Sequence, residues 1–207
     1  MAAPRISVII PVHNRAGLVG QAIDSVLGQG FADFELIVVD DGSSDGSDAV
    51  VAAHADPRVR LVRLGLNQGS NAARNAGIRA ARGGILCFLD SDDLYLPDKL
   101  ERVAALFAAD PELDAAVDSF VRVNSPRAKR SVTEVRNPDT GTAADFSRAL
   151  FTRELAKATS AISVRREAAI RAGLFDEEVR QRQDFDFLIR LADCAKCRSI
   201  SDILWIK

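Results

Sequence analysis

Acidic residues follow two short, largely apolar segments of this chain at the point where each segment ends. Asp40 and Asp41 come directly after residues 35–39, and Asp90, Asp92 and Asp93 come directly after residues 85–89. Carboxylates that share one cleft repel each other and lose hydration, so a cation between them is favoured. An Asp-x-Asp arrangement suits a hard divalent ion whose shell is completed by phosphate oxygens of a ligand. These acids therefore predict a divalent-metal site that also binds a phosphorylated molecule.

The segments that carry these acids alternate with amphipathic stretches through the first half of the chain. Apolar runs alternating with helical periodicity predict an α/β fold with a largely parallel central sheet. Ser44 is expected to cap the second helix and Pro97 to lie in the first turn of the fourth. Strands are predicted at 6–10, 35–39, 59–64 and 85–89, with helices at 18–27, 44–55, 69–82 and 97–107.

Residues that follow the strands of a parallel sheet meet at one edge of it. Ligands of open α/β sheets bind in the crevice outside that edge. His13 and Asn14 follow the first predicted strand, so they are expected beside the two acidic segments. Isolated acids such as Asp45 are interpreted instead as turn formers or helix caps.

The pattern becomes less regular after about Asp114. Residues 115–123 are expected to form a strand and 124–142 a long polar connection. Helices are predicted at 143–153, 166–172 and 184–195, a short strand at 161–164, and an apolar strand at 203–206. We interpret 1–207 as a single domain, in which the regular alternation extends to about 113 and the less regular part covers about 114–207. The end after an apolar run suggests that further polypeptide follows Lys207 in the full protein.

Composition limits the function classes. The chain has 207 residues, 47% of them hydrophobic and 27% charged, and a net charge of −2, which is typical of a soluble globular protein rather than a nucleic-acid binder. The basic run 127–130 is interpreted as a solvated loop. No run of about 18 apolar residues predicts a membrane span. Three cysteines favour a reducing cytoplasm, and Cys194 and Cys197 are interpreted as buried or half-buried thiols rather than zinc ligands.

Four blocks in this order resemble family 2 glycosyltransferases, which are inverting, nucleotide-sugar-dependent enzymes of the GT-A fold. The blocks are Ser7-Val8-Ile9-Ile10-Pro11-Val12-His13-Asn14-Arg15, Val38-Val39-Asp40-Asp41-Gly42-Ser43-Ser44-Asp45-Gly46, residues 67–77 and Phe88-Leu89-Asp90-Ser91-Asp92-Asp93. The resemblance covers about 5–110 and continues more weakly through 173–176 and 183–186. It implies a Rossmann-like α/β/α sandwich with a mostly parallel central sheet. It also implies a nucleotide-sugar-binding half at about 1–113 and an acceptor-binding half at about 114–207.

The resemblance also implies roles for residues of the donor site. The divalent metal is usually Mn²⁺ or Mg²⁺, and the nucleotide base is most often uracil. In this family pattern Pro11, Val12 and Asn14 line the nucleotide pocket. Asp41 accepts a hydrogen bond from the base, and Asp40 supports Asp41. Arg74 approaches the diphosphate or sugar, Asp90 and Ser91 contact the nucleotide sugar, and Asp92 is the metal ligand.

The general base of the resemblance falls near the start of a late helix, where the family has a Glu-Asp pair. This chain has Gln183 and Asp184, so Asp184 is the expected base and Asp186 a reserve candidate. A histidine that family members often carry after the last matched strand is not found before Lys207. His13 is interpreted as a wall of the pocket rather than as a ligand.

We therefore expect a transferase that moves a sugar, from a UDP-sugar, to a hydroxyl of a glycan or glycolipid, in polysaccharide, lipopolysaccharide or other glycan synthesis. The expected location is the cytoplasm, and attachment to the inner face of the membrane is left open, as is the oligomeric state. Gln183 keeps a catalytically degenerate nucleotide-sugar-binding domain as an alternative. A nucleotidyltransferase is a weaker alternative, because residues 11–14 are not a glycine-rich, basic phosphate loop.

Overall fold

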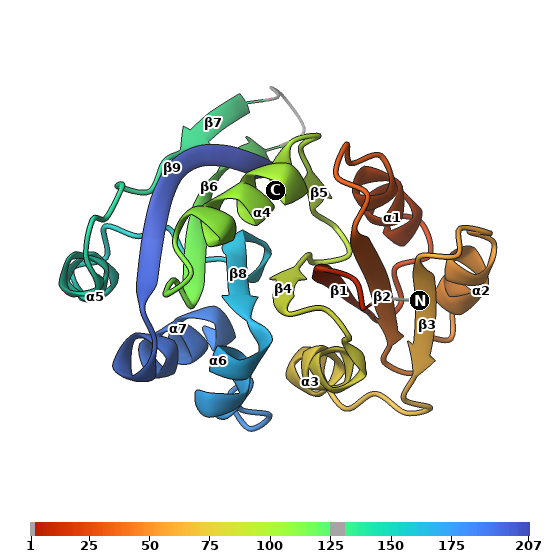
Figure 1. Ribbon diagram of the computed structural model, residues 1–207. Coiled ribbons are helices and arrows are strands. Elements are labelled where there is room, and N and C mark those ends of the chain that lie inside the picture. The colour runs from red at the N-terminus through yellow and green to blue at the C-terminus, as the bar shows by residue number, and fades with distance from the viewer. Residues whose placement is uncertain (1–2, 125–130) are drawn as a thin grey trace.

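The computed structural model describes residues 3–124 and 131–207. These residues form one nine-stranded sheet with the order β3-β2-β1-β4-β8-β6-β9-β5, and β7 pairs with β6 (Figure 1). The strands are β1 Ile6–Val12, β2 Phe34–Asp40, β3 Val59–Arg63, β4 Ile85–Phe88, β5 Leu94–Tyr95, β6 Ala115–Asn124, β7 Ser131–Val135, β8 Ile162–Arg165 and β9 Cys197–Ile206. The helices are α1 Val19–Leu27, α2 Ser47–Ala52, α3 Ser70–Ala80, α4 Lys99–Ala109, α5 Ala143–Phe151, α6 Arg166–Arg171 and α7 Gln183–Cys194, with a 3-10 turn at Thr159–Ala161.

The first four strands form the parallel part of the sheet. β1 pairs in parallel with both β2 and β4, and β2 pairs in parallel with β3. Because parallel crossovers are right-handed, the steps from β1 to β2 and from β2 to β3 put α1 and α2 on one face. The step from β3 to β4 runs the other way and puts α3 on the opposite face, as Figure 1 shows. The prediction of an α/β fold is confirmed.

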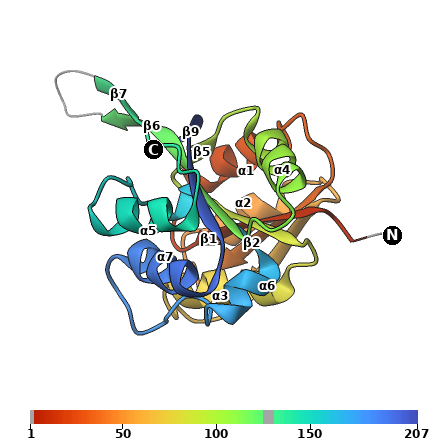
Figure 2. The ribbon, with the colours of Figure 1, turned by 60° about the vertical axis from the view of Figure 1, so that its left-hand side comes forward.

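The second half of the sheet is mixed rather than parallel. β8 runs antiparallel to both β4 and β6, whereas β9 is parallel to β6 and antiparallel to β5. β9 is long and curved, and it wraps across this half (Figure 1). The β6–β7 hairpin projects from the body of the molecule (Figure 2). The prediction of a continuous loop at 124–142 is wrong for β7, whose pairing with β6 outweighs its polar sequence.

Several predicted boundaries also need correction. β1 does not end before Pro11 but runs through it to Val12, because parallel pairing with β2 continues on that side. Ser44 does not cap α2, which begins at Ser47. The N-cap residue of α2 is Gly46, and Asp45, one residue earlier, accepts through Oδ1 from the Ser47 backbone N–H at 3.0 Å. Pro97 lies before α4, which begins at Lys99.

Three aromatic rings join the parallel half to the segment that leads into α7. Phe88 of β4 meets Phe175 edge-on with 5.2 Å between ring centroids, and Phe187 of α7 edge-on at 6.4 Å. Phe175 and Phe187 stack at 4.2 Å. All three side chains are buried. Aromatic pairs of this geometry add to the burial energy, so α7 is fixed against the strand that carries the acidic segment.

The structure also tests the predictions about the cysteines and about membrane spans. Cys197 is buried in β9, but Cys194 is exposed at the end of α7, so the interpretation of both as buried or half-buried thiols is wrong for Cys194. In the two described ranges no helix has the length and apolar character to cross a bilayer. The basic run 127–130 lies outside the described residues.

Candidate functional site

Most of the predicted donor-site residues line one cavity at the carboxyl ends of β1, β2 and β4. The cavity has a volume of about 390 Å³, and His13 and Ser70 lie on its wall as well. Its members come from segments far apart in the sequence, as the strand-end argument predicts. The predicted residues that line it are Pro11, Val12, Asp41, Arg74, Asp90, Ser91 and Asp92.

Asn14 and Asp40 do not line this cavity but shape the loop beside it. Asn14 has a φ of 52°, and its side-chain Oδ1 accepts from the Ser44 backbone N–H at 2.9 Å. Asp40 Oδ1 accepts from the Ser43 backbone N–H at 3.2 Å. Both side chains therefore hold the loop after β2 in place.

Asp41 ties the end of β2 to the start of α3. Its carboxylate is buried and accepts from the backbone N–H groups of Gln68 at 2.7 Å and of Gly69 at 2.8 Å. Gly42, with a φ of 71°, passes so close that a Cβ there would lie 2.7 Å from the Asn67 nitrogen. Each carboxylate oxygen keeps a second lone pair, so Asp41 can hold both loops and still accept from a ligand.

Arg74 is a buried cation on the cavity wall. Its Nη2 donates to Asp90 Oδ1 at 2.8 Å, and its Nη1 donates to Asn71 Oδ1 at 3.1 Å and Ser70 Oγ at 3.2 Å. The guanidinium lies 5.5 Å from the centroid of the Phe175 ring. Its Nε is buried without a hydrogen-bond partner among the described residues. The Arg74 guanidinium therefore brings positive charge to the cavity wall, which favours an anionic ligand there.

The acids of the segment 90–93 have different environments. Asp90 pairs with Arg74, Asp92 is exposed at the cavity, and Asp93 is buried and accepts from Ser160 Oγ at 2.6 Å. Burial raises the pKa of Asp93 to about 7, the Ser160 hydrogen bond opposes this rise, and the charge of Asp90 adds to it. Packing thus gives these three acids different environments. Among them, Asp92 is the one whose carboxylate is free to bind a cation.

The fit of a metal to this site can be tested on the donors present. Within residues 3–124 and 131–207, no group of three or more His, Cys, Asp or Glu side chains could hold a metal ion by itself. Asp92 makes no hydrogen bond or ion pair there, so it can offer both oxygens. Mg²⁺ is commonly held by one or two carboxylates together with substrate phosphates and water. The residues fit a metal whose remaining ligands come from a bound diphosphate.

Asp184 lies in a different cavity, of about 450 Å³, which also contains Phe151, Lys157 and Arg182. A third cavity, of about 390 Å³, shares Asn67, Gly69 and Ser70 with the cavity at the strand ends (the donor cavity), and Gln183, the chain neighbour of Asp184, also lines it. Gln183 Nε2 donates to Ser70 Oγ at 3.3 Å, which links the starts of α7 and α3. The structure therefore places Asp184 and Asp92 in different cavities.

Asp186, the reserve candidate, is occupied elsewhere. Its Oδ2 forms an ion pair with Arg190 Nη2 at 2.6 Å, one turn later in α7. Residues two apart on a helix also point in different directions. Asp184 is thus the carboxylate of this pair that faces a cavity.

Two asparagines of α3 position the segment before α7, and sequence reasoning gave them no role. Asn71 Nδ2 donates to the carbonyls of Asp176 at 2.7 Å and Val179 at 3.0 Å. Asn75 Nδ2 donates to the Phe175 carbonyl at 2.8 Å, and Asn75 Oδ1 accepts from the Phe175 N–H at 3.0 Å. Both side chains are buried. Their spacing of four residues in the block 67–77, which puts both on one face of a helix, was the sequence signal that could have identified them.

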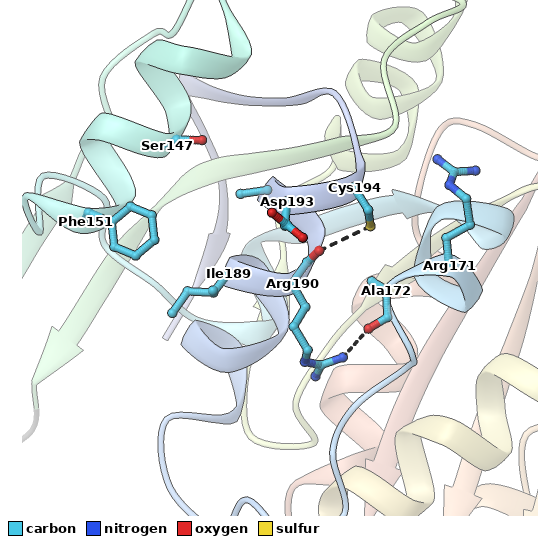
Figure 3. A pocket seen from close by; sticks show the side chains of 9 residues that line it. Ser147, Phe151, Arg171, Ala172, Ile189, Arg190, Asp193 and Cys194 are labelled. Carbon is cyan, nitrogen blue, oxygen red and sulfur yellow. Dashed lines mark hydrogen bonds between the residues drawn. The ribbon is translucent and has the colours of Figure 1, made fainter.

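The cavity between α5, α6 and α7, of about 460 Å³, contains none of the predicted site residues (Figure 3). Arg190 crosses it, donating to the carbonyls of Ala172 and Leu174 as well as pairing with Asp186 (the contact with Ala172 is drawn in Figure 3). Its guanidinium is therefore occupied by protein groups. We interpret Arg190 as a structural link between α6 and α7.

Comparisons with known proteins agree with this geometry. The family model described as Glycosyl transferase family 2 matches residues 7–170. Succinoglycan biosynthesis protein ExoO of Rhizobium meliloti is 47% identical over 100 residues, 48% of this chain and 29% of that protein. An uncharacterized protein of Mycobacterium tuberculosis is 31% identical over 201 residues, 92% of this chain and 62% of that protein. The chain thus spans less than two thirds of either relative.

Solved structures show the same fold. S. aureus TarS 1–349 in complex with UDP-GlcNAc matches with a TM-score of 0.83 at 23% identity, over 98% of this chain and 58% of that chain. The mannosyltransferase PcManGT from Pyrobaculum calidifontis, in complex with GDP-Man and Mn²⁺, matches with a TM-score of 0.74 at 24% identity, over 100% of this chain and 57% of that chain. The expected GT-A fold is confirmed.

Proposed function

The chain belongs to glycosyltransferase family 2, and we propose that it transfers a sugar from a UDP-sugar to a hydroxyl of a glycan or glycolipid, with inversion at the anomeric carbon. The observation that supports this most strongly is the convergence of Asp41, Arg74 and Asp92 on one cavity at the strand ends. The UDP-GlcNAc complex of S. aureus TarS supports a uridine nucleotide, and the GDP-Man complex of PcManGT makes guanosine the competing choice.

In this proposal the donor cavity holds the nucleotide sugar. Pro11 and Val12 form the apolar wall of the nucleotide pocket, and Asp41 accepts a hydrogen bond from the base. The Arg74 guanidinium contributes positive charge to the wall that faces the diphosphate or sugar, while its ion pair with Asp90 keeps it oriented. α3 begins at Ser70, on the cavity wall, without a side-chain cap, so its first backbone N–H groups can also serve an anion.

Asp92 is the proposed protein ligand of Mn²⁺ or Mg²⁺. When bound, such a metal offsets the negative charge that develops on the departing nucleoside diphosphate. The exposure of Asp92 at the cavity leaves its oxygens available for this role. Asp93 cannot share it directly, because its side chain is buried against Ser160.

Asp184 is the proposed general base. Its carboxylate takes the proton of the acceptor hydroxyl as the oxygen attacks the anomeric carbon. The ring cluster around Phe175 and the amides of Asn71 and Asn75 hold the start of α7 relative to the donor cavity. Fixed placement of donor and acceptor supplies much of the remaining acceleration.

The direct test is turnover. The protein is incubated with UDP-glucose, UDP-GlcNAc or GDP-mannose, Mn²⁺ and a panel of sugar acceptors, and release of the nucleoside diphosphate is measured. We expect release from a uridine donor and its loss in Asp92→Ala and in Asp184→Asn, with circular dichroism showing that both variants remain folded. Unchanged turnover in either variant would remove that residue from its proposed role.

The second candidate is a domain that binds nucleotide sugar without transferring it. It is favoured by Gln183 at the position where the family pattern has glutamate. Calorimetric binding of UDP together with no release from any donor would support this candidate over transfer. The proposed setting is the cytoplasm, and free cysteine thiols among the described residues fit a reducing compartment.

A further inference from the structure

The cavity that contains Asp184 also contains three cationic side chains. Arg153, Lys157 and Arg182 line it, so its charged groups sum to a positive value although the whole chain carries −2. Within the part of the chain that the structure describes, no hydrogen bond or ion pair engages these three side chains. By contrast Arg190, on the same helix as Asp184, is fully paired with protein groups. The cavity thus has an excess of unpaired positive charge.

Lys157 is held inside this cavity rather than extended into solvent. Its Nζ lies 4.6 Å from the centroid of the Phe185 ring, and the side chain is half-buried. Burial lowers the pKa of Lys157, the negative charge of Asp184 opposes that shift, and the charges of Arg153 and Arg182 add to it. The three cations are therefore near enough to repel one another. A bound anion would offset that repulsion.

Arg153 and Arg182 reach the cavity from the ends of two helices. Their φ angles are 65° and 57°, in the left-handed region that non-glycine residues seldom adopt. Arg153 comes just after α5, and Arg182 directly precedes α7, which starts without a side-chain cap. The start of α7 adds its own partial positive charge to the same cavity.

We propose that this cavity binds an anionic group, carboxylate or phosphate, of the acceptor, so that the acceptor is an acidic sugar or a sugar phosphate rather than a neutral glycan. The inference rests on the proposed function in assigning Asp184 to the reacting hydroxyl. Phe151, Leu155 and Phe185 supply the apolar wall for a sugar ring. The diphosphate of the donor is not the expected occupant, because Arg74 serves a separate cavity.

The test measures binding in a matched series of ligands. Octyl β-glucoside, octyl β-glucuronide and octyl β-glucoside 6-phosphate are titrated calorimetrically into the protein with UDP and Mg²⁺ present. Two or more charge-assisted hydrogen bonds predict binding of the charged ligands at least about tenfold tighter than the neutral one. The carboxylate and phosphate ligands separate the two sources of the anion. In the double variant Lys157→Gln/Arg182→Gln we expect the charged ligands to bind no better than octyl β-glucoside.

Two further variants locate the effect. Arg148→Gln removes an exposed charge of α5 that lies outside this cavity, and Arg74→Gln removes the cation of the donor cavity. The preference for charged ligands should survive both. Equal binding of all three ligands, a preference that persists in Lys157→Gln/Arg182→Gln, or its loss in Arg74→Gln would overturn the inference. A preference that behaves as expected in a protein that releases no nucleoside diphosphate would refute the proposed function but support the anion site.

Discussion

Replacing Asn75 with alanine removes the amide that holds Phe175, at the start of the segment leading into α7. Asn75 binds both the N–H and the carbonyl of Phe175, at 3.0 and 2.8 Å, and both residues are buried. The substitution leaves two buried backbone groups without partners. If Asn75 places α7 relative to the donor cavity, the substitution must lower the rate of transfer as well as the free energy of unfolding.

The expected size of the effect follows from these contacts. A buried polar group left unsatisfied costs about 1–3 kcal/mol, so two predict a loss of roughly 2–6 kcal/mol in the free energy of unfolding. Misplacing a catalytic group by about 1 Å can cost about 100-fold in rate. We therefore expect kcat to fall about 10- to 100-fold. KM for the donor should stay close to the wild-type value, because Asn75 does not line the donor cavity.

Gln29→Ala is the matched control. Gln29 is also a buried amide with backbone partners: its Nε2 donates to the Ser25 and Leu96 carbonyls at 3.0 and 2.8 Å, and its Oε1 accepts from Leu100 N at 3.0 Å. It joins α1 to the start of α4, away from the described cavities. Gln29→Ala should lower the free energy of unfolding by a similar amount, whereas activity per folded molecule should be unchanged.

The assay combines unfolding with kinetics. Urea unfolding is followed by the fluorescence of Trp205, the single tryptophan, which is fully buried. Transfer is then measured at a temperature where both variants are folded. If Asn75→Ala lowers kcat no more than Gln29→Ala does, Asn75 has a structural role only, and the positioning argument is wrong.

Three further predictions concern stability, each measured by urea or thermal unfolding. Lys99→Met should lower the free energy of unfolding by about 3–5 kcal/mol, because it leaves the buried Asp118 carboxylate without its partner. Adding Asp118→Leu should restore most of that stability, and no recovery would contradict the ion-pair argument. Hydrogen bonds from Arg58 lower the pKa of Asp56 to about 2. Asp56→Asn should therefore lower Tm at pH 5, which is above the unfolded pKa of about 3.9. The difference in Tm between wild type and variant should vanish as the pH falls through about 2. An equal difference at both pH values would exclude this cause. Gly77→Ala should cost about 1–3 kcal/mol, because its new Cβ would overlap a buried isoleucine of β1; a neutral effect would mean that α3 can shift.

The parallel half of the fold was predictable because its signals are local. Each of its strands is a continuous buried run next to a helix of regular apolar period, as in β1 and β2. The mixed half depends on distant pairing. β7 is largely exposed and polar, so only its partner β6 makes it a strand, and the antiparallel direction of β8 has no local signal.

The candidate site divides in the same way. Strand ends predicted which acids meet, but not how packing distinguishes them. Only coordinates show that Asp90 is neutralised by Arg74, that Asp93 is buried against Ser160, and that Asp92 is free. The three cations around Asp184 are still harder to foresee. Arg153 and Lys157 lie in the connection after α5, whereas Arg182 directly precedes α7, and no spacing in the sequence brings these two segments together.

The most direct test of the account is calorimetric binding of UDP with and without Mn²⁺ in wild-type protein and in Asp92→Asn. The account predicts that Mn²⁺ tightens UDP binding at least about tenfold in the wild type, because Asp92 and the diphosphate hold the ion together. In Asp92→Asn this tightening should disappear, while UDP binding without metal is retained through Asp41 and Arg74. No binding of UDP to the wild type, or the same gain from Mn²⁺ in Asp92→Asn, would contradict the account.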